Sequence, residues 1–238
     1  MGKLLGELLD GWTWSALTTV HASLAEGDEL AKRYPAAIGP LAGMREQSED
    51  AYCSLAALLE GRGHGVLFLA EPPRVPVGWR IARQWVIEQR VASGPIAAPD
   101  GILVEKLNKG DAEEMVALAK LAEPGPFAER TIELGGYVGV RDPASGRLVA
   151  MAGQRTALTG FREVSAVCTH PDYRGRGYAR ALTACVGREI AARGETPFLG
   201  VNVINESAKH VYERLGFAVR RTFYGLAVIP PDAVSPPG

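Results

Sequence analysis

The sequence is poor in cysteine and has no long apolar run. Its three cysteines are widely spaced, odd in number and without a CxxC pair, so they fit neither a disulfide framework nor a zinc ribbon. No stretch approaches the roughly 18 consecutive apolar residues that a membrane helix needs. Glu7 and Asp10 interrupt the short apolar run at the start. We therefore expect no export signal and no membrane partner, and reduced thiols in a cytoplasmic protein.

An excess of either charge is also missing. The 238 residues include 26 Lys and Arg against 27 Asp and Glu, a formal net charge of −1. This balance argues against a large basic face, so no nucleic-acid partner is expected unless a local patch supplies the charge. The chain is 47% hydrophobic and 22% charged, which excludes extended disorder and leaves one large or two small globular domains.

Several catalytic patterns are absent as well. The four histidines show no HExxH motif or paired spacing, so no metal site is expected. No GxSxG motif supports a serine nucleophile. Cys168 lies within an apolar strand-like run, which predicts a core thiol rather than a nucleophile.

The clearest break in the chain is a stretch of small residues with two prolines and two glycines at 93–101. We predict a domain boundary there, with an N-terminal α/β lobe at 1–100 and a second domain at 101–238. In the lobe, periodicity predicts a helix at 46–60, a strand at 66–69 and one or two strands at 79–91. The lobe carries no chemical motif, so its role is left open.

After this boundary, strand and helix patterns alternate. Strands are predicted at 102–107, 137–140, 148–153, 164–169, 198–203 and 217–229, and helices at 111–122, 127–133, 177–193 and 207–215. The last residues, 230–238, are expected to be a loose tail. The order of elements predicts an α/β fold in which helices flank a mixed central sheet.

One strand–turn–helix segment carries the clearest chemistry. The strand at 164–169 runs into a Gly- and Arg-rich turn that opens the helix at 177. Unpaired N–H groups and the positive end of the helix dipole favour a phosphate there, and glycines let it approach the main chain. The segment is not a Walker loop, because it lacks GxxxxGK[ST]. It is not a Rossmann turn, because Arg180 replaces the third glycine. The alternative interpretation of this segment is a Gly-rich turn that binds no phosphate and whose arginines are solvated.

Two motifs in this half resemble the GNAT superfamily of acyl-CoA-dependent N-acyltransferases. Arg174-Gly-Arg-Gly177-Tyr-Ala179 matches the signature [RQ]xxGx[GA] between a strand and its helix. The run from Asn205 to Phe217 matches the second signature, NxxAxxxYxxxGF, at the expected separation. The resemblance covers about residues 101–229. The N-terminal lobe lies outside it, as in two-lobed relatives such as the glycine N-acyltransferase-like enzymes, whose second lobe is degenerate.

The resemblance implies a GNAT-type mixed sheet and transfer of an acetyl group from acetyl-CoA to a primary amine. The turn would hold the pyrophosphate of coenzyme A, and the pantetheine arm would lie between two splayed strands. Tyr212 would protonate the leaving thiolate and Glu163 would be the base. The residues implied to bind the cofactor are Val167, Cys168, Thr169, Arg174, Gly175, Arg176, Gly177, Tyr178, Ala179, Arg180, Asn205, Ala208 and Tyr212.

Each of these assignments has an alternative. Tyr212 also fits an apolar helix face as a core residue, and Glu163 also fits a solvated charge at a strand end, with water as the base. Acceptor contacts are expected from Phe127, Met151 and Arg155. The acceptor itself is left open as a small-molecule or peptide amine, and a homodimer is one option for assembly. A non-catalytic acyl-CoA-binding module and nucleic-acid binding through the arginines are the alternative functions.

Overall fold

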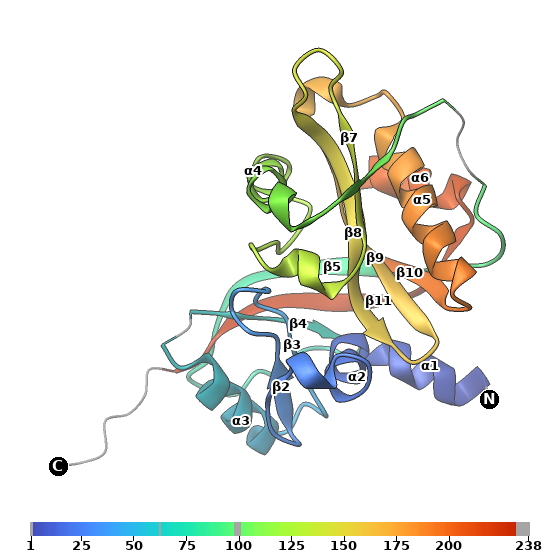
Figure 1. Ribbon diagram of the computed structural model, residues 1–238. Helices are drawn as coiled ribbons and strands as arrows, with labels where there is room; N and C mark the ends of the chain where they lie inside the picture. Colours follow the sequence, from blue (N-terminus) through green and yellow to red (C-terminus); the bar gives the residue numbers. More distant parts are fainter. Residues whose placement is uncertain (1, 62, 98–100, 232–238) are drawn as a thin grey trace. The chain divides into compact units, whose positions relative to one another are not determined.

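The computed structural model describes residues 2–61, 63–97 and 101–231, and these form two compact units (Figure 1). The first unit comprises Met1–Ala36, Pro40–Ile87 and Thr222–Gly238, and the second comprises Ala37–Gly39 and Glu88–Arg221. The predicted boundary at 93–101 falls within the second unit, although its residues 98–100 lie outside the described residues. Most of the predicted tail, from 232 onward, also lies outside them.

An eight-stranded mixed sheet supplies the framework, as the sequence predicted. Its strand order is β4-β11-β5-β10-β9-β8-β7-β6. β9 and β10 are parallel, whereas β6 to β9 form antiparallel neighbours. The division between the units falls inside the two longest strands, β5 and β11. The strands are β4 (Gly65–Leu69), β5 (Arg80–Ala92), β6 (Glu105–Leu107), β7 (Tyr137–Arg141), β8 (Leu148–Leu158), β9 (Phe161–Thr169), β10 (Thr196–Asn202) and β11 (Phe217–Ile229).

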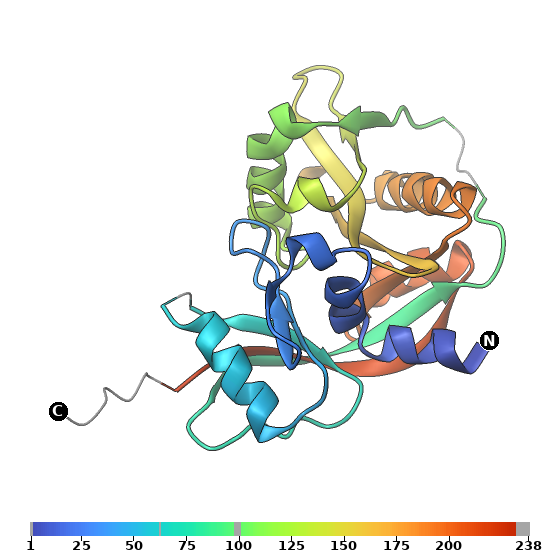
Figure 2. The same cartoon turned by 60° about the horizontal axis from the view of Figure 1, so that its bottom comes forward.

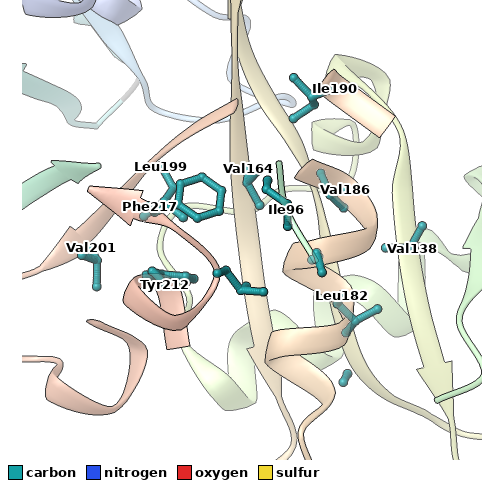
Figure 3. Packing of buried hydrophobic residues seen from close by; sticks show 14 of the residues in the cluster. Ile96, Val138, Val164, Leu182, Val186, Ile190, Leu199, Val201, Tyr212 and Phe217 are labelled. Atoms are coloured by element: carbon teal, nitrogen blue, oxygen red, sulfur yellow. The ribbon is translucent and has the colours of Figure 1, made fainter. Parts of the chain in front are cut away.

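In the second unit, helices cover both faces of the sheet (Figure 1). α5 (Tyr178–Ala192) and α6 (Glu206–Arg214) pack on one face, where Leu182, Val186 and Tyr212 join a buried cluster with Val138 (Figure 3). α4 (Ala112–Ala122) packs on the other face through Met115. Neighbouring strand residues alternate between these two clusters, as side chains of a pleated strand must. We call the two sides the α5/α6 face and the α4 face.

The first unit contains elements that the sequence analysis did not find. These are α1 (Gly2–Asp10), α2 (Trp12–Thr18) and a small antiparallel sheet of β1 (Glu26–Gly27), β2 (Ala31–Arg33) and β3 (Ala42–Met44). The predicted helix at 46–60 is confirmed as α3 (Glu49–Leu59), whose first turn is capped by the Ser48 side chain. Figure 2 shows α3 beside these short strands. Leu55 and Leu59 of α3 belong to the same buried cluster as Leu226 and Val228 of β11.

The other predicted elements are confirmed with three corrections. The strand predicted at 102–107 is limited to β6, and the helix predicted at 127–133 is a short 3-10 turn, η3 (Thr131–Leu134). Asp111 precedes α4, but its carboxylate accepts the Asn108 N–H at 2.8 Å instead of capping that helix.

Candidate functional site

The site begins with a β-bulge in the middle of β9. Met151 of β8 pairs with Cys168 and Gly153 pairs with Ser165, so Ala166 and Val167 together oppose the single residue Ala152. Ala166 has a φ of 52°, the left-handed region that residues with a Cβ rarely adopt. The extra residue reverses the alternation of side chains, so Ala166 and Cys168 point to the α4 face while Val167 contacts the α5/α6 face.

The bulge lies where β9 leaves its parallel neighbour. β9 and β10 pair at only three positions, ending at Glu163 with Phe198. Beyond this point β9 continues to Thr169 and β10 to Asn202, and no further pair joins them in these two fully described strands. Strands that diverge leave main-chain donors and acceptors facing each other without partners, and an extended ligand chain can pair with such an edge. Val167 and Thr169 lie on this unpaired part of β9, as the pantetheine assignment requires.

The N-terminus of α5 follows directly from the diverging strand. Gly177 precedes the helix with a φ of 80°, and no side chain caps the first turn. The N–H groups of Tyr178, Ala179 and Arg180 therefore remain available at the positive end of the helix dipole. Gly175, with a φ of 77°, turns the chain just before it. This geometry is suited to a phosphate group.

The arginines of the turn are exposed, and one of them is held in place. The guanidinium of Arg176 stacks over the ring of Tyr173, with its Cζ 4.7 Å from the ring centroid. Tyr173 in turn shares a hydrogen bond with Asp142 in the β7–β8 hairpin. Burial and the negative charge of Asp142 raise the pKa of the Tyr173 phenol. Arg176 is thus directed by two elements of the fold, while Arg174 and Arg180 are exposed on the same turn.

α6 brings two further predicted residues to the α5/α6 face. The Asn205 side chain caps α6 by accepting the Ala208 N–H at 3.1 Å, so its predicted capping role is confirmed. Tyr212 is buried, its ring lying 6.3 Å from that of Phe217 (Figure 3). Burial raises the pKa of the Tyr212 phenol to about 12, and the nearest ionisable group that acts on it is Cys168. Among the described residues, none forms a hydrogen bond with the Tyr212 hydroxyl.

Glu163 has a different environment from the one expected of a solvated strand end. It is 1% exposed, and its carboxylate accepts hydrogen bonds from Arg155 Nε at 3.1 Å and Arg155 Nη2 at 2.6 Å. The Thr156 N–H and hydroxyl also donate to Oε2. Glu163 therefore forms a buried ion pair, and both of its oxygens are engaged. Its assignment as a base stays a prediction.

The α4 face carries the residues expected to contact the acceptor. Met151 and Cys168 belong to its buried cluster, and Phe127 packs edge-on against Tyr137 with ring centroids 5.8 Å apart. Burial raises the pKa of the Cys168 thiol to about 12, so a nucleophilic thiolate is disfavoured and the core assignment holds. Sequence analysis missed Tyr137, because only the cross-strand register reveals its position.

The structure thus brings most of the predicted site together. The bulged part of β9, the turn, the start of α5 and the α6 residues all lie in the second unit. Within the described ranges, no group of three or more His, Cys, Asp or Glu residues could hold a metal ion. The same ranges include no helix long and apolar enough to span a membrane.

The chain is similar to known acetyltransferases over most of its length. Residues 137–225 match the family model of FR47-like proteins. A crystal structure from Novosphingobium aromaticivorans, of a protein assigned to the GNAT family as an acetyltransferase, is 38% identical with a TM-score of 0.86. The match covers 93% of this chain and 98% of that protein.

Two curated relatives are mycothiol acetyltransferases from Streptomyces avermitilis and Streptomyces scabiei. They are 30% and 32% identical to this chain over 142 residues. These matches cover 52% of this chain and 45% of each relative, so the chain spans about half the length of the curated relatives it matches.

Proposed function

Since the chain belongs to the GNAT family of acetyltransferases, we propose that it moves an acetyl group from acetyl-CoA directly to a primary amine. The observation that carries this proposal is the end of β9–β10 pairing beside the bulge, immediately before the uncapped start of α5. A long extended ligand with a diphosphate at one end suits this combination. The relatives are acetyltransferases, so the non-catalytic alternative is not favoured.

The residues present fit coenzyme A in two separate ways. The N–H groups that open α5, with Arg176 beside them, would bind the pyrophosphate. On the side of β9 that no longer pairs with β10, the main chain of Val167 and Thr169 would pair with the pantetheine amides, and Asn205 would reach the same arm from the start of α6. The thioester would then lie near the bulge, where main-chain donors can polarise its carbonyl.

Transfer itself requires a neutral amine and a stabilised leaving group. The amine nitrogen forms a bond to the acetyl carbon, the carbon–sulfur bond breaks, and the nitrogen loses one proton. Holding the two reactants together supplies much of the rate. Because both oxygens of Glu163 are engaged, water is the better supported acceptor of that proton.

Tyr212 is proposed to act on the sulfur. With a pKa of about 12, its phenol keeps its proton at neutral pH. A thiol has a pKa of about 8.5, so full proton transfer from this phenol to the thiolate is uphill. A hydrogen bond to the developing negative charge is the contribution that such a phenol can make throughout the reaction. The thiolate takes a proton from solvent as coenzyme A leaves, which balances the proton that the amine gives to water.

Calorimetric titration with acetyl-CoA tests the proposal, with desulfo-coenzyme A and a dinucleotide as controls. Micromolar binding of both coenzyme A ligands, but not of the dinucleotide, is expected. Release of thiol in the presence of amines then tests transfer. Absence of binding would contradict the assignment of the cofactor.

Charge reversal at the turn locates the phosphate. Arg176→Glu should raise the Kd for acetyl-CoA by about 10-fold or more, as loss of a charge-assisted hydrogen bond predicts. Arg188→Glu is the matched control, because Arg188 is exposed near the other end of α5 and undergoes the same charge change. Equal effects of the two variants would indicate a general charge effect and no specific phosphate site at the turn.

A further inference from the structure

Tyr137, at the start of β7, has a buried hydroxyl that the proposed reaction does not yet use. The residue is 2% exposed, and none of the residues that the structure describes forms a hydrogen bond with its hydroxyl. A buried hydroxyl without a partner lowers stability, so such groups call for an explanation. In the second unit Tyr137 belongs to the cluster on the α4 face, whereas Tyr212 belongs to the cluster on the α5/α6 face.

The sheet register directs the Tyr137 ring toward the bulge. Tyr137 pairs with Gly153 of β8, and Gly153 pairs with Ser165, the residue before Ala166. A Cβ added at Gly153 would come within 2.2 Å of the Tyr137 ring, so the ring lies directly over this glycine. Because position 153 has no side chain, the Tyr137 ring can cover β8 at this point on the α4 face.

The groups around the phenol are those of the candidate site. Arg155 of β8 and Glu163 and Cys168 of β9 act on its ionisation, and burial raises its pKa well above the ordinary value. Cys168 also acts on Tyr212. Tyr137 shares the buried cluster of the α4 face with Cys168, whereas Tyr212 lies in the cluster of the α5/α6 face. Since Tyr212 is assigned to the leaving sulfur, the opposite face remains for the incoming amine.

We propose that Tyr137 is an acceptor-binding catalytic residue, whose phenol oxygen accepts a hydrogen bond from the attacking amine and orients its lone pair toward the thioester. This proposal rests on the proposed acetyl transfer. Phe127, Met151 and Cys168 belong to the same face and are apolar. The acceptor that suits this face is therefore a primary amine on an uncharged apolar or aromatic side chain. The one carboxylate beside the phenol, Glu163, is already paired with Arg155 and offers no free partner for an ammonium group.

Tyr137→Phe tests the role of the hydroxyl without disturbing the ring. Thiol release from acetyl-CoA is measured with tryptamine, phenethylamine, spermidine and kanamycin as acceptors, none of which carries a thiol, and with water alone. For any amine that the wild type acetylates, kcat/KM for the amine should fall about 10-fold or more, while the Kd for acetyl-CoA stays unchanged. Tyr52→Phe is the matched control, because Tyr52 also has a buried hydroxyl without a partner but lies in the first unit.

Thermal stability separates a catalytic role from a structural one. A structural role of the hydroxyl would make Tyr137→Phe lower the Tm. Because the hydroxyl has no partner, Tyr137→Phe should leave Tm unchanged or raise it. Gly153→Ala should displace the ring and reproduce the kinetic defect, with some loss of stability. A Tyr137→Phe enzyme that keeps wild-type kcat/KM, or that loses stability, would overturn the assignment of Tyr137 while acetyl transfer stands. A wild type that binds acetyl-CoA but releases no thiol with any acceptor would overturn the proposed function, and this inference with it.

Discussion

The Tyr212 hydroxyl is the most direct target at the scale of single residues. The Tyr212 ring is buried against Phe217, and none of the described residues forms a hydrogen bond with its hydroxyl. Tyr212→Phe should therefore keep Tm and the Kd for acetyl-CoA but lower kcat by about 100-fold, because the hydrogen bond that stabilises the leaving thiolate is lost. Single-turnover thiol release separates this chemical step from product release. An unchanged rate would remove Tyr212 from the mechanism.

Measurements on Glu163→Gln can separate a structural role of Glu163 from a catalytic one. Its buried ion pair with Arg155 predicts that Glu163→Gln lowers the free energy of unfolding by about 3 kcal/mol, since one partner of a buried pair is removed. Glu195→Gln is the matched control, because its pair with Arg162 is partly exposed and should contribute less than about 1 kcal/mol. Urea unfolding measures both values. If Glu163→Gln leaves stability intact but abolishes the acidic limb of the pH–rate profile, Glu163 is the base.

At the scale of elements, the bulge in β9 should be sensitive to the residue type at position 166. Ala166→Val places a branched side chain at a φ of 52° in a buried cluster, which we expect to lower the free energy of unfolding by about 2 kcal/mol or more. The same variant should lose acetyl-CoA affinity, because a straightened β9 no longer diverges from β10. Ala166→Gly is the control, since glycine adopts a positive φ freely. Equal stability of the Val and Gly variants would contradict this account of the bulge.

The elements show which parts of the site a sequence can predict. α5 was predicted at 177–193 and is found at Tyr178–Ala192, because Gly177 and Gly194 mark both of its ends. The Gly- and Arg-rich turn and the Asn205 cap can likewise be predicted from a few neighbouring residues in the sequence. The bulge cannot be predicted in this way, because Ala166 carries no signal for a positive φ and the register with β8 decides it. The contact of Tyr137 with Gly153 and the pairing of Glu163 with Arg155 likewise depend on neighbouring strands. α1 and α2 were missed because both are short.

At the scale of the whole molecule, buried phenols should limit stability in alkali. The chain has seven tyrosines, and burial raises the pKa of Tyr52 and Tyr212 to about 12 and that of Tyr137 further. An unfolded phenol ionises near pH 10, so above this pH the unfolded state loses protons that the folded state keeps. Stability should be constant below about pH 10 and fall as pH rises through the folded pKa values, on the order of 2–3 kcal/mol for each phenol.

Tyrosinate absorbance and circular dichroism during an alkaline titration check this expectation. The partly exposed phenols of Tyr173, Tyr178 and Tyr224 should ionise reversibly while the secondary structure is intact, and at least three others should ionise only when the chain unfolds. Early ionisation of all seven tyrosines in a folded chain would contradict the burial described for them.

The path of β11 also decides where the chain can be cut. Both GNAT signatures lie after the predicted boundary, which invites expression of residues 101–238 as a fragment. Such a fragment would carry the second half of β11 without β4, although Tyr224–Val228 pair with Gly65–Leu69 and Leu226 and Val228 are fully buried. The freed strand would offer an apolar edge to its copies, and the fragment would aggregate. Because the second unit is an insertion between two segments of the first, a soluble short version requires a fragment that begins near residue 88 and ends near residue 221.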